Sequence, residues 1–121
     1  MVKKEVEKLL KKVQKPARYT GGELNSVVKD KNDVKLIYAF CFPDNYEIGM
    51  SHLGMKILYS VVNAREDAWC ERVFAPWEDM ETLMRENDVK LYALESGDAL
   101  SEFDLVGCLI GFERLGFELS V

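Results

Sequence analysis

The sequence predicts an α/β fold of the doubly wound type, in which helices flank a mostly parallel sheet. Two apolar runs, at 34–42 and 104–110, have the length and composition of buried strands. Between them, apolar residues recur three or four positions apart in two stretches, as they do in amphipathic helices. Strands that alternate with helices are joined by crossovers and lie parallel in one sheet. The chain of 121 residues, 48% of them hydrophobic, is long enough to bury one such core.

An amphipathic helix is expected to precede the sheet. Five apolar residues recur at helical spacing between lysines: Val2, Val6, Leu9, Leu10 and Val13. Pro16 is expected to end this helix, and the turn-forming residues of 19–26 predict an irregular segment. The chain therefore divides into an N-terminal helix and irregular lead over 1–31 and an α/β domain over 32–121.

The α/β domain is expected to alternate strands with helices. The first strand, over 34–42, is nearly continuous in apolar character and is therefore predicted to be buried on both faces. A loop over 43–49, a helix over 50–63 and a short strand over 70–75 follow. Glu78 and Asp79 begin the next helix, where the helix dipole favours carboxylates, and Asn87 ends it. A short strand over 90–94 and a buried strand over 104–110 complete the pattern.

Composition and charge exclude several classes of protein. The longest runs without a charged residue, such as 36–43, have eight residues, whereas a membrane-spanning helix needs about 20. The charged first dozen residues lack the apolar segment of a secretory signal, so a cytoplasmic protein without a membrane partner is expected. Residues 1–31 hold nine basic and four acidic groups, and the rest hold seven and seventeen. This acidic body argues against a nucleic-acid partner.

The three cysteines, Cys41, Cys70 and Cys108, fit neither a disulfide framework nor a metal site, because their number is odd and their spacing is wide. Each lies in an apolar stretch, and we expect buried, reduced thiols.

The loop after the first strand is the first place to expect a binding site. In an open parallel sheet, ligands bind beyond the carboxyl ends of the strands, at the point where the strand order reverses. Gly49 allows backbone geometry closed to other residues, and Gly54 is expected to let the following helix approach the sheet. Asp44 and Ser51 could instead serve only to cap the turn and the helix.

Three stretches carry a resemblance to a known family: KPARYTGGELNSVVKD at 15–30, FPDNYEIGMSHLGMKILYSVVN at 42–63 and CERVFAPWEDMETLM at 70–84. The chain, over about 15–107, resembles the N-terminal region of B12-binding-domain-containing radical SAM proteins, which are predicted iron–sulfur oxidoreductases. The resemblance implies a flavodoxin-like, Rossmann-like cobalamin-binding fold ahead of a radical SAM barrel. The barrel's C-x-x-x-C-x-x-C motif does not occur in this sequence. We therefore expect an incomplete domain, truncated before the radical SAM domain, with no iron–sulfur or SAM site of its own.

The same resemblance implies cobalamin as the cofactor. Cobalamin-binding domains of the methionine-synthase type use D-x-H-x-x-G, whose histidine is the lower cobalt ligand, whereas this chain has D-x-Y-x-x-G at 44–49. A neutral tyrosine is a poor cobalt ligand, so base-off binding without a protein histidine is expected. The expected cofactor contacts, with no protein metal ligand among them, are Asp44, Tyr46, Gly49, Met50, Ser51 and His52. His52 could be a displaced ligand or a locally satisfied polar residue.

The leading interpretation is a cofactor-binding module that is not catalytic by itself and whose partner is the radical SAM domain of a longer protein. An alternative is a protein-interaction or oligomerisation module without a cofactor, for example a homodimer formed through an uncovered sheet edge. A small enzyme or phospho-receiver is a third interpretation, which the absence of an acidic cluster beside Asp44 disfavours.

Overall fold

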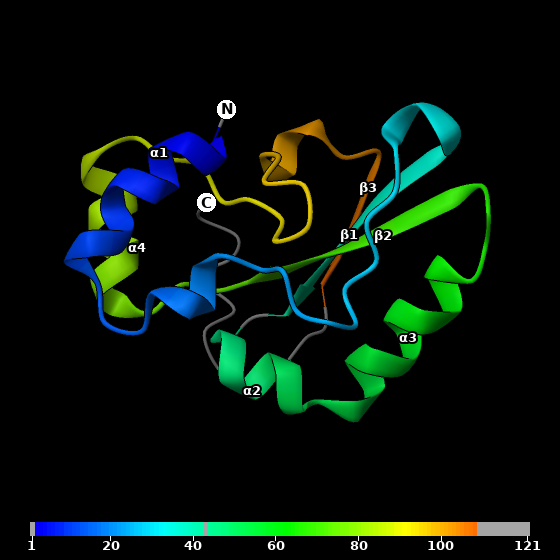
Figure 1. Cartoon of the computed structure of the whole chain (residues 1–121), viewed down its shortest axis with the longest axis horizontal. Helices are drawn as coiled ribbons and strands as arrows, with labels where there is room; N and C mark the ends of the chain where they lie inside the picture. Colours follow the sequence, from blue (N-terminus) through cyan, green and yellow to red (C-terminus); the bar gives the residue numbers. More distant parts are fainter. Residues whose placement is uncertain (1, 43, 109–121) are drawn as a thin grey trace.

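The centre of the molecule is a parallel sheet of three strands in the order β2-β1-β3 (Figure 1). The structure is a computed structural model that describes residues 2–42 and 44–108. Strand β1 (Leu36–Phe42) pairs with β2 (Ala68–Phe74) on one side and with β3 (Leu105–Cys108) on the other. An order of 2-1-3 is typical of flavodoxin-like doubly wound sheets. The predicted α/β class and parallel sheet are confirmed.

Two helices join β1 to β2, where the sequence predicted one. Residues 46–49 were expected in a loop, but α2 (Tyr46–Ser51) begins there because Asn45 Oδ1 accepts from the backbone N–H of Ile48. The chain then leaves helical geometry at His52, and α3 (Leu53–Asn63) follows and packs against β2. The helix predicted over 50–63 is therefore interrupted near its start.

The connection from β2 to β3 contains one α-helix and a long irregular segment. Helix α4 (Glu78–Glu86) begins with acidic residues and ends at Asn87, as predicted. The strand predicted over 90–94 is wrong, since this stretch forms only a single antiparallel bridge, between Tyr92 and Ala99. Most of its backbone hydrogen bonds are with 97–100, and one bond, from the N–H of Leu94 to the carbonyl of Arg72, attaches its end to β2 without forming a further strand of the sheet. A 3-10 turn, η4 (Leu100–Glu102), precedes β3.

The N-terminal lead packs onto the same body. Helix α1 (Val2–Leu9) buries Val6 and Leu9 and lies beside α4 (Figure 1). Three short 3-10 turns follow before the sheet, η1 (Leu10–Lys12), η2 (Pro16–Tyr19) and η3 (Lys31–Asp33). The amphipathic helix is thus confirmed, although Pro16 begins η2 and the helical backbone has already ended at Lys12.

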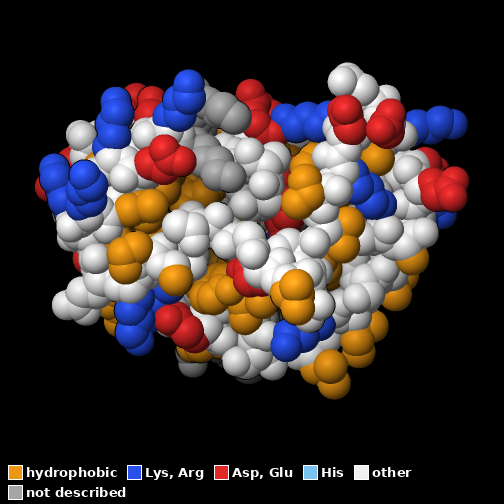
Figure 2. All heavy atoms as spheres, viewed as in Figure 1, with side chains coloured by type: hydrophobic (Ala, Val, Ile, Leu, Met, Phe, Trp, Pro, Cys, Tyr) orange, Lys and Arg blue, Asp and Glu red, His pale blue; other side chains and the backbone are white. Residues whose placement is uncertain are grey.

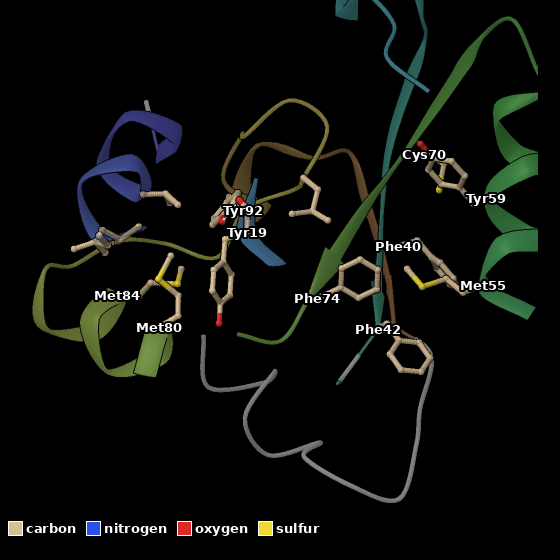
Figure 3. Packing of buried hydrophobic residues seen from close by; sticks show 14 residues of the cluster. Tyr19, Phe40, Phe42, Met55, Tyr59, Cys70, Phe74, Met80, Met84 and Tyr92 are labelled. Atoms are coloured by element: carbon tan, nitrogen blue, oxygen red, sulfur yellow. Dashed lines mark hydrogen bonds between the residues drawn. The ribbon is translucent and has the colours of Figure 1, made fainter. Parts of the chain in front are cut away.

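The core fills both faces of the sheet. On one face, Phe40 and Phe42 of β1 and Phe74 of β2 pack with Met55 and Tyr59 of α3 (Figure 3). The alternate residues of the strands face the other way, as the twofold repeat of a strand requires. There a second cluster contains Ala39, Cys41, Val73, Leu91 and Ala93. The prediction that the first strand is buried on both faces holds for its last four residues.

Strand β3 is more exposed than the sequence predicted. The apolar run over 104–110 was expected to be a buried strand, but Leu105 and Val106 are exposed. The reason is position, because β3 is an edge strand of the described sheet and pairs only with β1. Residues 109 and 110 of that prediction lie outside the described part of the chain.

The cysteine prediction holds in part. Cys41 and Cys70 are buried, but Cys108 on β3 is exposed, contrary to expectation, because it shares the edge position of its strand. None of the three forms a disulfide bond in the described structure. Over the same residues, no helix has the length and apolar character needed to span a bilayer.

Candidate functional site

The loop after β1 is tied directly to the end of β2. Asp44 Oδ1 accepts from the backbone N–H of Asn45 at 2.7 Å, and the Asp44 carbonyl accepts from the N–H of Ala75 at 2.9 Å. Asp44 therefore shapes the turn that leads into α2. The carboxyl ends of the two strands are held together by this short connection.

Gly49 is the position where α2 comes closest to the sheet. A Cβ atom on Gly49 would lie 2.1 Å from Phe74 Cε1, far inside van der Waals contact. The sequence assigned this close approach to Gly54 and a special backbone geometry to Gly49, and both assignments are wrong, since Gly49 has ordinary helical backbone within α2. A Cβ on Gly54 would meet only the ring of His52, because Gly54 lies in the first turn of α3.

Tyr46 points into the molecule. Its hydroxyl donates to Glu23 Oε1 at 2.5 Å, and its ring packs edge-on against Phe74 with the centroids 5.6 Å apart. Burial, together with the neighbouring carboxylate of Glu23, raises the pKa of Tyr46 to about 12. The phenol therefore stays neutral at physiological pH.

The last three predicted site residues have different surroundings. Ser51 Oγ donates to the carbonyl of Glu47, and His52 Nδ1 accepts from the N–H of Met55 at 3.1 Å, which caps α3. Met50 instead turns toward the sheet, where its sulfur accepts from Arg72 Nη1 at 3.0 Å. The six predicted residues thus separate into residues with local hydrogen bonds (Asp44 in the turn, Ser51 within α2, His52 as the cap of α3) and inward-facing residues (Tyr46, Gly49, Met50).

Arg72, which the sequence did not single out, is the centre of a buried ionic network. From β2 its Nε donates to Glu95 Oε1 at 2.5 Å, and its Nη2 donates to Glu23 Oε2 at 2.7 Å. Its own backbone N–H donates to the second oxygen of Glu95 at 2.8 Å. Tyr59 also donates to Glu95 and lies under the guanidinium, 5.2 Å from ring centroid to Cζ. Arg72 therefore holds two carboxylates that come from distant parts of the chain.

This network joins the three stretches on which the family resemblance depends. Glu23 belongs to the first, Tyr46, Met50 and Tyr59 to the second, and Arg72 to the third. One signal could have found it, since a strand otherwise buried carries an arginine, and buried charges need partners. The sequence did not show which carboxylates these partners are.

A cavity of about 500 Å³ opens beside the network. Its walls are the segment 23–26, the end of α2 and the first turns of α3, and Arg72 lines it from the sheet. A second cavity, at the carboxyl ends of β1 and β2 and lined by Tyr46, Phe74 and Trp77, holds only about 20 Å³. Within residues 2–42 and 44–108, no group of three or more His, Cys, Asp or Glu side chains could hold a metal ion.

Glu71, beside Arg72 on β2, faces the opposite side of the sheet and is fully buried. Ser96 donates its backbone N–H to Glu71 Oε1 at 2.8 Å, while Oε2 has no partner among the described residues. Burial, which the hydrogen bond from Ser96 only partly offsets, raises the pKa of Glu71 above its ordinary 4.5. At neutral pH this carboxyl group opposes folding.

Replacing Glu71 by glutamine should stabilise the chain at neutral pH. A carboxyl group whose pKa is higher folded than unfolded binds its proton more tightly in the folded state, so stability falls as the pH rises above about 4.5. Glu71→Gln removes this dependence and keeps an acceptor for Ser96. Urea unfolding of both proteins between pH 4 and pH 8 should show a difference that grows with pH. A constant difference would contradict the buried-charge explanation.

Parallel strands in the order 2-1-3, with helices in the crossover connections, define an α/β module of the doubly wound class. Residues 54–119, more than half of the chain, match the model of the family described as radical SAM proteins, N-terminal. The chain therefore belongs to this family of N-terminal regions of radical SAM proteins. Neither the search of curated proteins nor that of solved structures found a match.

Proposed function

We propose that the chain is a cofactor-binding module of a radical SAM protein, catalyses nothing by itself, and holds cobalamin at the carboxyl edge of its sheet. The observation that carries the proposal is the strand order. The chain leaves β1 toward β2 on one side, while β3 lies on the other, so the carboxyl end of β1 is a topological switch point. The D-x-Y-x-x-G sequence at 44–49 begins at that end.

The side chains near this end suit a cobalamin that takes no ligand from the protein. The neutral phenol of Tyr46 is engaged by Glu23, and His52 caps α3 through Nδ1. The cavity of about 20 Å³ at the ends of β1 and β2 is too small for a corrin, so cobalamin would lie on the outer surface of this edge. Cobalamin would supply the organometallic chemistry, and the module would orient it toward the radical SAM domain of the longer protein.

Titration with hydroxocobalamin tests the proposal. We expect the chain to change the visible spectrum of cobalamin at about 100 µM. A dissociation constant of about 100 µM corresponds to a binding free energy of about −5.5 kcal/mol. After reduction to cob(II)alamin, its electron paramagnetic resonance spectrum should lack coupling to an axial nitrogen. His52→Ala, which removes the cap of α3 and a ring contact with Phe42, is the matched control and should give the same spectrum. An unchanged visible spectrum would overturn cobalamin binding, and nitrogen coupling lost in His52→Ala would overturn the ligand-free geometry.

A second candidate function, self-association without a cofactor, is favoured by the outer face of α3. Leu53, Ile57 and Val61, spaced four apart, are 70%, 53% and 61% exposed. Figure 2 shows hydrophobic side chains gathered along the lower right edge of the molecule, over α3. A row of this kind favours contact with another protein surface. Sedimentation velocity distinguishes the two candidate functions. A dimer that forms with rising protein concentration, equally with and without cobalamin, would support this second function.

A further inference from the structure

The cavity of about 500 Å³ beside Arg72 is distinct from the carboxyl edge of the sheet. It lies over the face of β2 that α3 covers, under the segment 23–26. Its volume is within the range of about 300–1,000 Å³ typical of small-molecule sites. The lining combines two methionines, Met50 and Met55, with the charged residues Glu23, Lys56 and Arg72.

The polar group in this cavity that still lacks a strong hydrogen-bond partner is a donor. Both oxygens of Glu23 are engaged, one by Tyr46 and the other by Arg72. Arg72 has carboxylate partners for Nε and Nη2, but among the described residues its Nη1 meets only the sulfur of Met50. A thioether is a weak acceptor, so a guanidinium that is nine-tenths buried keeps an N–H in need of a better one. Lys56 adds an ammonium group at the exposed side of the cavity.

The unpaired charge at this cavity is that of Lys56, whose ammonium group forms no salt bridge with the described residues. Arg72 is also positive, but it is bonded to two carboxylates, those of Glu23 and Glu95. A single carboxylate could pair with Lys56 and accept from Arg72 Nη1, whereas the doubly charged form of phosphate would be repelled by Glu23 and Glu95. The thioethers of Met50 and Met55 offer a soft, adaptable surface for an aliphatic group.

We propose that this cavity binds a small organic monocarboxylate. The carboxylate accepts hydrogen bonds from Arg72 Nη1 and Lys56 Nζ, where bonds to charged donors are the strongest available. The aliphatic part lies against Met50 and Met55. All of these residues come from the second and third stretches of the family resemblance, while Glu23 of the first orients the guanidinium. Two of the expected cobalamin contacts, Gly49 and Met50, also line this cavity, but the proposal requires neither bound cobalamin nor a contact at the carboxyl edge.

Nuclear magnetic resonance of the full chain with labelled methionine methyl groups tests this site. Hexanoate is the probe, and its neutral amide, hexanamide, and inorganic phosphate are the comparisons. Hexanoate should shift the methyl signals of Met50 and Met55 and leave those of Met80 and Met84, which lie in the core away from the cavity. The amide and phosphate should bind at least about tenfold more weakly, because each lacks either the single charge or the aliphatic group.

Lys56→Gln tests the site without disturbing the fold, because Lys56 is exposed. A change at Arg72, which is buried, could unfold the chain instead. We expect it to weaken hexanoate binding about fivefold, the size of one partly exposed ionic contact. Lys8→Gln, on the exposed side of α1, is the matched control and should bind as the parent does. Equal binding of hexanoate and hexanamide, absence of shifts at Met50 and Met55, or unchanged binding by Lys56→Gln would each overturn the proposal.

Discussion

Replacing Arg72 by alanine should destabilise the folded chain by about 3–5 kcal/mol, the cost of breaking a buried ion pair by removing one partner. The loss is large because Glu95 is fully buried and would keep its charge with no guanidinium beside it. Glu23 would lose the same partner, and with it the hydrogen bond that attaches the segment 23–26 to β2. Much of this cost is the burial of unpaired carboxylates rather than the net worth of the contacts.

Urea unfolding monitored by circular dichroism measures this effect. The matched control is Arg65→Ala, because Arg65 also makes two hydrogen bonds to one carboxylate, that of Asp67, but at the exposed surface. Water screens such a pair, so the control should unfold near the parent. A double variant, Arg72→Met with Glu95→Met, should recover much of the stability, since both charges are then absent. Equal midpoints for Arg72→Ala and Arg65→Ala would show that the network does not hold the fold.

The second large effect is expected at Gly49. Gly49→Ala should lower stability by about 1–3 kcal/mol, the usual cost of forcing an extra methyl group into a packed core. The added Cβ would lie 2.1 Å from the ring of Phe74, which is itself buried and packed against Tyr46. Relief requires moving α2 or the ring, and either movement disturbs the end of β2.

Gly54→Ala is the matched control, five residues further on and also helical. Its Cβ would lie 3.0 Å from the exposed His52 ring, so a small shift of that side chain suffices and α3 need not move against the sheet. Alanine is the better helix former by about 1 kcal/mol, so this variant should be as stable as the parent or more so. Thermal unfolding of the two variants gives the comparison directly. If Gly49→Ala were the more stable of the two, α2 would not approach the sheet as described.

Local sequence patterns predicted those parts of the fold that depend on local chemistry. The alternation of apolar strands with the helices at 50–63 and 78–87 followed from periodicity, and the acidic first turn of α4 was recognised from the helix dipole. The start of α2 at Tyr46 was missed, since a single side-chain cap from Asn45 decides it. At 90–94, strand-forming residues do not form a strand because most of their backbone hydrogen bonds are with 97–100, and only Leu94 donates to the sheet, at Arg72.

The candidate site could be predicted only in outline. The loop after β1 was found because the carboxyl end of a central strand is a general location for ligands. Sequence reasoning included Tyr46, Gly49 and Met50 but gave no reason for Arg72 or Glu23. A charged residue inside an apolar strand indicates that a partner exists, yet the partners of Arg72 lie 49 and 23 positions away.

The amino-acid sequence alone determines the class of this protein, its alternation of strands and helices, and, over residues 54–119, its match to the N-terminal regions of radical SAM proteins. Each depends on residues close together in the chain. The tertiary structure decided that β3 is an exposed edge, that Gly49 and not Gly54 meets the sheet, and that Glu23, Arg72 and Glu95 form one network. Burial and charge pairing between distant residues depend on how the chain folds back on itself, which no local period encodes.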